Sequence, residues 1–291
     1  MSGTTETTMS FRSGRPMDAK VCGRICYEAF GAIARAHNFP PDFPSVEVAI
    51  DLITMLLSHP GFFSVVAEAG GQIVGSNFLD ERSTIAGLGP ITVDPKVQNR
   101  RVGRALMQAA LDRASERRCP GVRLLQTAYH TRSLALYTTL GFHPRESIAC
   151  MQGPPLRVAR PGYHVRPATA DDVEACNRVC AAVHGHDRGG EVLDAINQGT
   201  ARVVEHGNRV TGYATDLAFF AHAVGETTHD LMALIGAATA FGGPGILVPV
   251  RNAMLLQWCL ARGLRIVQLM TLMTVGLYNE PAGAYLPSVL Y

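Results

Sequence analysis

The residues best placed for chemistry form a basic loop at the start of a predicted helix. Residues 91–93 are a β-branched run that suits a strand, and Pro95 ends it because proline fixes φ and supplies no N–H donor. Apolar residues recur at helical spacing from Val102 onward, so the helix begins directly after the loop. The first N–H groups of a helix lack an intrahelical acceptor and lie at the positive end of its dipole. They favour an anion such as a pyrophosphate, to which the loop adds the charges of Arg100, Arg101 and Arg104.

The spacing of this loop excludes two common phosphate-binding motifs, since neither G-x-x-x-x-G-K-[ST] nor G-x-G-x-x-G is present. The segment Gln98-Asn99-Arg100-Arg101-Val102-Gly103 instead resembles the coenzyme-A loop of the GCN5-related N-acetyltransferases (GNAT), written Q/R-x-x-G-x-G/A, with Arg101 at the first glycine. The alternative is an ordinary helix start with solvated arginines. The resemblance implies acetyl-CoA as co-substrate, its pyrophosphate held by the loop amides and its pantetheine arm by the preceding strand. The implied binding residues are Ile91, Thr92, Val93, Gln98, Asn99, Arg100, Arg101, Val102, Gly103, Arg104 and Ala105.

A second segment follows in the order that this family uses. Residues 124–128 suit a strand and residues 131–140 a helix, and the segment resembles N-x-x-A-x-x-x-Y-x-x-x-G-F. His130 stands at the asparagine and Ser133 at the alanine, whereas Tyr137 matches the motif. The thiolate of coenzyme A needs a proton as it departs, and the resemblance assigns Tyr137 as the general acid. It also adds His130 and Ser133 to the cofactor-binding residues. The alternative for Tyr137 is a packed helix tyrosine with its hydroxyl in water.

Composition sets limits on partners and location. The net charge of +2 gives no reason to expect nucleic acid. Seven cysteines are dispersed without zinc spacing, and the histidines at 184–187 match no ligand pattern, so we expect no metal. Dispersed cysteines without a signal peptide predict reduced thiols and a cytoplasmic location. The uncharged run at 231–250 is cut by a glycine-rich turn, which favours a core segment over a membrane span.

Length and breaker residues predict two domains. At 291 residues the chain can bury two cores, and proline and glycine clusters mark a connector. We predict a disordered start at 1–10, a GNAT domain at 11–153, a linker at 154–161 and a second GNAT-like domain at 162–291. The second resembles the first at its opening, R-P-A-T-x-x-D, where Thr169 and Asp172 form a predicted helix cap. The expected fold class is α/β (α+β), each domain a mixed, mostly antiparallel sheet flanked by helices.

The second half lacks the chemistry of the first. Its loop at 225–230 is acidic, so its carboxylates would repel a pyrophosphate, and Cys259 stands where the acid tyrosine would be. We therefore expect a degenerate domain that completes the acceptor pocket, packs as a partner domain or binds another ligand.

Two functions are compatible with these features. The first is an acetyl-CoA-dependent N-acetyltransferase acting by direct attack on a primary amine, with a small-molecule acceptor favoured because tandem domains tend to enclose a cleft. The alternative is a non-catalytic acyl-CoA- or ligand-binding sensor or scaffold protein. No membrane partner is expected, and a homodimer is left open. The general base is not chosen by the sequence among Glu68, Asp80, Glu81 and His130.

Overall fold

The computed structural model describes residues 9–98 and 100–291. The chain divides into two compact units, Met1–Glu81 with Leu88–Cys119 and Arg82–Gly87 with Pro120–Tyr291. The domains predicted at 11–153 and 162–291, with a linker at 154–161, remain predictions. Of the stretch predicted to be disordered, Met9 and Ser10 begin a strand, and residues 1–8 lie outside the described residues, as does Asn99.

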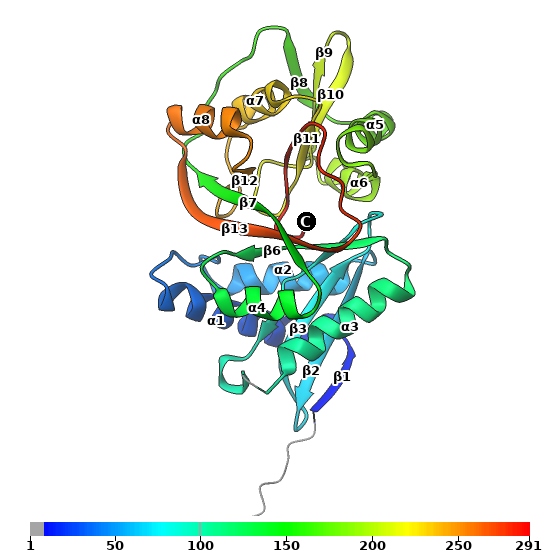
Figure 1. Ribbon diagram of the computed structural model, residues 1–291, viewed down its shortest axis with the longest axis vertical. Coiled ribbons are helices and arrows are strands. Elements are labelled where there is room, and N and C mark those ends of the chain that lie inside the picture. Colours follow the sequence, from blue (N-terminus) through cyan, green and yellow to red (C-terminus); the bar gives the residue numbers. More distant parts are fainter. Residues whose placement is uncertain (1–8, 99) are drawn as a thin grey trace, which may run out of the picture. The chain divides into compact units, whose positions relative to one another are not determined.

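The first unit is an antiparallel sheet with three helices. The hairpin between β2 and β3 turns at Gly70 and Gly71, whose φ values of 57° and 77° require glycine's freedom. Buried Val74 and Leu106 lie in one apolar cluster, so α3 packs on the sheet. Its elements are β1 (Met9–Ser13), α1 (Ala19–Ala36), α2 (Val46–Ser58), β2 (Phe62–Ala69), β3 (Gln72–Asp80), β5 (Thr92–Val93) and α3 (Val102–Glu116) (Figure 1).

The strand expected from Ile85 to Val93 is two strands instead of one. The chain forms β4 (Ala86–Leu88) and β5, and between them Gly89 has a φ of 134° and Pro90 follows. Proline supplies no N–H for a strand ladder, which accounts for the interruption. β5 is therefore a separate short strand, and it pairs with β3.

The second unit contains the remaining elements, arranged in two groups of strands. Five antiparallel strands form one sheet in the order β14-β11-β10-β9-β8. In the other group β4 pairs parallel with β6, and β6, β13, β7 and β12 are antiparallel neighbours. The elements are β6 (Gly121–Thr127), α4 (Thr131–Thr139), β7 (His143–Gln152), β8 (Tyr163–Pro167), α5 (Val173–His184), α6 (Gly189–Asn197), β9 (Arg202–His206), β10 (Arg209–Ala214), β11 (Ala223–Gly225), α7 (Thr228–Ala237), β12 (Ile246–Pro249), α8 (Ala253–Ala261), β13 (Arg265–Gly276) and β14 (Ala284–Leu286).

Strand β13 lies between β6 and β7, although these two strands are neighbours in sequence. Met270 pairs with Thr127 of β6, and Arg265 pairs with Gln152 of β7. On its other edge β7 pairs with β12, with Ile246 opposite Met151 (Figure 1). β13, a strand from near the end of the chain, thus lies between the two strands that precede and follow α4 in sequence.

The same ion-pair network stands at the start of each half. Arg12 donates from Nη1 to Asp18 at 2.7 Å and from Nε to Glu68 at 2.8 Å. Asp18 also accepts from the backbone N–H of Arg15 at 2.8 Å, in the arrangement of a helix cap. The second copy keeps the six-residue Arg–Asp spacing. Arg166 donates from Nη1 to Asp172 at 2.8 Å and from Nε to Glu205 at 2.9 Å. The predicted cap of Thr169 and Asp172 is confirmed, and the internal repeat extends to individual bonds.

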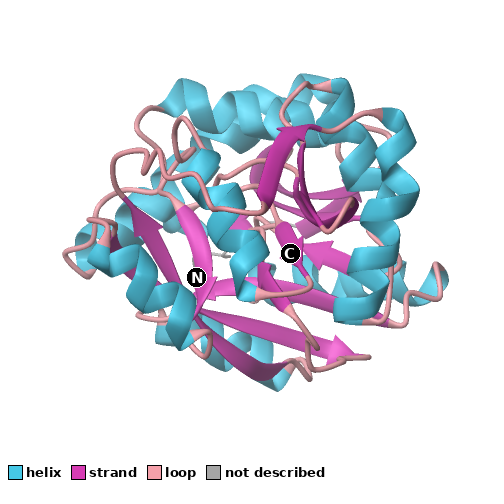
Figure 2. Ribbon diagram, turned by 90° about the horizontal axis from the view of Figure 1, so that it is seen from above, coloured by secondary structure: helices cyan, strands magenta, loops and turns pink. Residues whose placement is uncertain are grey.

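Helices flank mixed, mostly antiparallel sheets, as Figure 2 shows, and this confirms the predicted fold class. The uncharged run at 231–250 contributes the buried residues of α7 and β12 to a core cluster. Among the described residues, no helix has both the length and the apolar character needed to cross a bilayer.

Candidate functional site

The predicted pantetheine strand lies against β3 in the first unit. Thr92 pairs with Ser76 and Val93 with Gly75, and a side chain at Gly75 would come within 2.6 Å of the Thr92 carbonyl oxygen. Ile91 packs at the margin of the apolar cluster beneath α3. Gln98, the first residue of the motif, donates from Nε2 to the carbonyl oxygen of Val93 at 3.2 Å. The glutamine thereby fixes the start of the loop to the end of β5.

Arg101 adopts the backbone conformation that a glycine would favour. It has φ 62° and ψ 7°, in the left-handed region, and it is the N-cap residue of α3. Its side chain is exposed and does not cap the helix. Arg101 therefore adopts the backbone conformation expected of the glycine that stands at this position in the motif, and its side chain lies in solvent.

The start of α3 leaves several backbone donors without helical partners. The first helical hydrogen bond of the loop runs from the N–H of Ala105 to the carbonyl oxygen of Arg101 at 3.1 Å. By helix geometry, the N–H groups of Val102 and Gly103 precede it and have no intrahelical acceptor. Val102 is buried, which anchors the turn, whereas the Arg100 and Arg104 side chains are exposed. Donors and positive charge are thus combined in one segment.

Tyr137 is buried on α4 in the second unit. It is 8% exposed, and its ring packs against Phe142 with centroids 6.3 Å apart. The turn that follows α4 is closed by a hydrogen bond from the Phe142 N–H to the Tyr137 carbonyl oxygen at 3.1 Å, with Gly141 at φ 90°. Burial raises the pKa of the Tyr137 phenol above its usual value of 10. The hydroxyl therefore stays protonated at neutral pH, as a proton donor requires.

The two variant positions of the second motif meet at a buried glutamine. Gln126 donates from Nε2 to the carbonyl oxygen of His130 at 2.8 Å and to Ser133 Oγ at 3.1 Å. Ser133 donates in turn to the same His130 carbonyl oxygen at 2.9 Å. The side chain of Gln126, the penultimate residue of β6, thus fixes the first turn of α4. Sequence reasoning missed Gln126, whose only signal was a polar residue within an apolar strand.

Two of the four candidates for the general base, Glu81 and Glu68, form ion pairs with arginines. Glu81 accepts two hydrogen bonds from Arg113, at 2.6 and 3.0 Å. Glu68 belongs to the network of Arg12. Both carboxylates are thus already hydrogen-bonded to guanidinium groups. Asp80 is buried at the end of β3, and His130 is the N-cap residue of α4.

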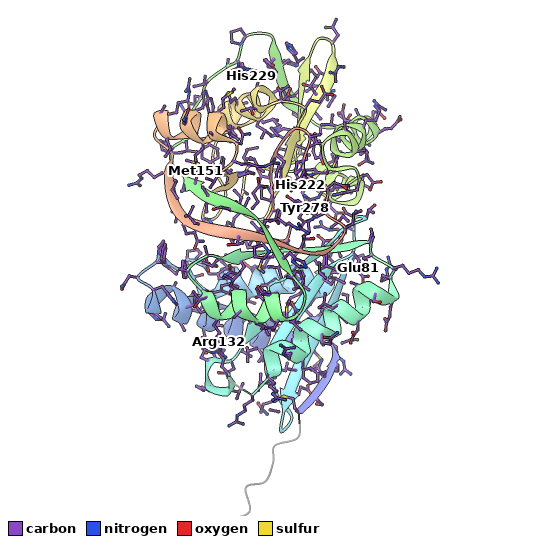
Figure 3. All side chains as sticks on the ribbon, viewed as in Figure 1. Glu81, Arg132, Met151, His222, His229 and Tyr278 are labelled. Carbon is purple, nitrogen blue, oxygen red and sulfur yellow. The ribbon has the colours of Figure 1, made fainter. Side chains whose placement is uncertain are left out.

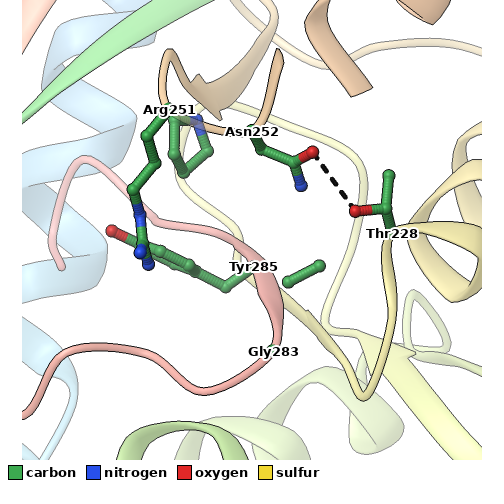
Figure 4. Close-up of a pocket in the computed structure, with 7 residues that line it drawn as sticks. Thr228, Arg251, Asn252, Gly283 and Tyr285 are labelled. Carbon is green, nitrogen blue, oxygen red and sulfur yellow. Dashed lines mark hydrogen bonds between the residues drawn. The ribbon is translucent and has the colours of Figure 1, made fainter. Parts of the chain in front are cut away.

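The corresponding region of the second half has a different arrangement. A pocket of about 420 Å³ lies at the start of α7, where Thr228 Oγ1 donates to Asn252 Oδ1 at 3.2 Å (Figure 4). Strand β14 contributes Tyr285 to this pocket and pairs with β11. The buried Asp230 carboxylate accepts from the Thr227 N–H at 2.8 Å, so α7 is capped by an acidic side chain of the chain itself. This arrangement disfavours a pyrophosphate, in contrast to α3.

The predicted site residues fall into two groups. Residues 91–105 lie in the first unit, with Asn99 outside the described residues, and His130, Ser133 and Tyr137 lie in the second. Cys259, at the acid position of the second half, is a buried thiol whose pKa burial raises to about 12. Within the described part of the chain, no group of three or more His, Cys, Asp or Glu side chains is arranged to hold a metal ion.

Known proteins resemble this chain in sequence and in fold. Residues 30–142 match the family model described as "Acetyltransferase (GNAT) family". A candidate acetyltransferase from Pyrococcus horikoshii aligns with a TM-score of 0.72 at 18% identity, covering 95% of this chain and 94% of that one. A GCN5-related N-acetyltransferase from Sphaerobacter thermophilus aligns at 0.61 and 16% identity, covering 94% and 96%. No curated protein matches the sequence.

A third solved structure bears on the repeat. It is a tandem GNAT protein from the clavulanic acid biosynthesis pathway, which aligns with a TM-score of 0.57 at 14% identity and covers 92% of this chain and 98% of its own. At such identities the likeness concerns the fold. Residues 30–142 thus resemble the acetyltransferase (GNAT) family in sequence, and the fold of the chain is similar to that of a tandem GNAT protein.

Proposed function

We propose that the protein transfers the acetyl group of acetyl-CoA to a primary amine of a small molecule. The observation that carries this proposal is the start of α3, where Arg101 takes the left-handed conformation and the following N–H groups have no helical acceptor. An anionic ligand such as the pyrophosphate of coenzyme A suits these donors and the exposed arginines beside them. Thr92 and Val93 would hold the pantetheine arm through their backbone groups.

The reaction is a direct attack within a ternary complex. The amine nitrogen forms a bond to the thioester carbon, the tetrahedral intermediate collapses, and the carbon–sulfur bond breaks. The amine loses a proton to a base, for which Glu68, Asp80, Glu81 and His130 are the candidates. Tyr137 protonates the departing thiolate, and burial, which raises the pKa of its phenol, keeps the proton on the hydroxyl beforehand. Positioning of α4 by Gln126 keeps that phenol in place.

Calorimetric titration with acetyl-CoA tests the donor site. We expect one equivalent to bind to the wild type, and we expect Gly103→Glu to abolish binding, because a carboxylate in the loop repels the pyrophosphate. Gln198→Glu adds the same charge at an exposed position of the second unit and serves as the control. If the wild type does not bind acetyl-CoA, the proposal fails, and the alternative is a sensor of another ligand.

The role of Tyr137 is tested separately. Thiol release during a screen of small amines identifies an acceptor, and Tyr137→Phe is then compared with the wild type. We expect turnover to fall about 10²–10⁴-fold, the usual contribution of a general acid, with coenzyme-A affinity within about twofold. Unchanged turnover would remove Tyr137 from the mechanism while leaving the donor site intact.

A further inference from the structure

The second unit buries an arginine that has no anionic partner. Arg123 lies on β6 and is 1% exposed. Its Nη1 group contacts the hydroxyl of Tyr291, and the Tyr291 ring lies 4.4 Å from its guanidinium carbon. The Nε and Nη2 groups are buried and have no hydrogen-bond partner among the described residues. An unpaired buried cation is costly, so these two donors indicate that something else pairs with them.

A neighbouring arginine shows what such a pair of donors normally holds. Arg188 donates from Nε and Nη2 to the two oxygens of Glu191, at 2.8 and 2.6 Å. These two groups form the planar fork with which a guanidinium binds a carboxylate or a phosphate through two hydrogen bonds. In Arg123 the same fork is unfilled by the chain. The contrast within one unit points to an oxyanion at Arg123.

The charge of the surrounding groups leads to the same conclusion. Glu191 is already engaged by Arg188, by Ser83 at 2.9 Å and by His222 at 3.1 Å. Burial lowers the pKa of His222 to about 4, so this histidine is neutral at pH 7. Glu191 thus pairs with Arg188, whose Nη2 group also donates to the backbone oxygen of Tyr291. Among the described residues, no carboxylate forms an ion pair with Arg123.

The ring of Tyr278 also packs near Arg123. Its ring lies 5.1 Å from the guanidinium carbon of Arg123 and 5.0 Å from that of Arg145, which is exposed. Figure 3 labels Tyr278 and His222 in the second unit. Tyr278 is half-buried, in an irregular segment after β13. Arg123 and the exposed Arg145 thus contact the same tyrosine ring.

We propose that the Nε and Nη2 groups of Arg123 bind a compact oxyanion, the carboxylate or phosphate group of a small molecule. This site is independent of acetyl transfer. The guanidinium fork supplies two parallel hydrogen bonds, and the apolar rings of Tyr278 and Tyr291 exclude water from them.

Titration with inorganic phosphate and with acetate tests the site and distinguishes the two anions. The Gly103→Glu protein is used throughout, so that the loop before α3 does not contribute to phosphate binding. We expect Arg123→Met to weaken binding of the preferred anion at least tenfold. Arg265→Met removes an exposed charge from β13 and should leave the affinity within twofold. Equal affinities of a folded Arg123→Met protein and its parent would overturn the proposal.

A second measurement needs no loss of the side chain. The ¹⁵Nε–¹H resonance of Arg123, assigned by comparison with Arg123→Lys, should shift on addition of the bound anion. Arg123→Lys keeps the charge but loses the fork, so it should bind less tightly than the parent protein. If neither anion binds and the resonance does not move, no anion site exists at Arg123.

Discussion

At the scale of single residues, the loop before α3 shows what a sequence motif leaves open. The sequence predicted that a helix begins directly after the loop, which is confirmed, and Arg101 was the loop's one departure from the motif. Only coordinates show that Arg101 takes a left-handed φ with its side chain in solvent, because the preference of a single residue does not determine its φ. Gln126 was missed for a related reason, since its partners are backbone oxygens that no motif records.

The strained position of Arg101 leads to a stability prediction. A non-glycine residue in this region costs about 1 kcal/mol, so Arg101→Gly should raise the free energy of unfolding by about 0.5–1 kcal/mol. Arg104→Gly is the control, because Arg104 lies within α3, where glycine should destabilise. Urea unfolding monitored by circular dichroism measures both. A loss of stability in Arg101→Gly would show that its conformation carries no strain.

At the scale of secondary-structure elements, the ion-pair network at the start of each half is the clearest sign of the repeat. The network joins β8, the start of α5 and β9 in the second unit, through one arginine and two carboxylates. The sequence predicted the cap formed by Asp172 and its place in the repeat. It did not predict the arginine's second partner, Glu205, because that contact depends on the strand pairing of β8 with β9.

Removal of this arginine should change the response to acid. The hydrogen bond from Arg166 lowers the pKa of Asp172 to about 2 from an ordinary value of 3.8. A lowered pKa contributes stability above pH 3.8 and loses it as pH falls toward 2. Arg166→Met should therefore be less stable than the wild type at pH 7, with the difference shrinking between about pH 4 and pH 2.

Thermal unfolding across this pH range measures the effect. Arg178→Met is the matched control, because Arg178 pairs with Glu174 on the exposed face of α5. Such a pair contributes little, so this variant should follow the wild type at every pH. A gap between Arg166→Met and the wild type that stays constant down to pH 2 would assign the effect to lost packing.

At the scale of the whole molecule, the sequence predicted the fold class and the order of most elements, but not the pairing of the strands. Hydrophobic periodicity and local composition located β6, α3 and α4, since these signals are local. The position of β13 between β6 and β7 depends on contacts between segments far apart in sequence. Local sequence patterns predict which segments are strands, but they do not determine which strands pair with each other in the sheet.

The position of β13 between β6 and β7 predicts how the chain behaves when it is cut. A fragment of residues 1–153 would leave the facing edges of β6 and β7 without a partner, so we expect it to aggregate or to remain partly unfolded. Co-expression with residues 154–291 should restore a soluble complex, because the second fragment supplies β13. Copurification and circular dichroism report the result. A stable, monomeric 1–153 fragment would contradict this account.

The same strand also affects how the chain folds during synthesis. When β7 leaves the ribosome, about 110 residues remain to be translated before β13 begins. At a translation rate of about 5–20 residues per second, the edges of β6 and β7 that pair with β13 remain unpaired for on the order of ten seconds. Over that interval the nascent chain presents unpaired backbone groups that other chains can bind. The yield of folded protein should thus depend on chaperones and on a low growth temperature more than the stability of the folded protein would suggest.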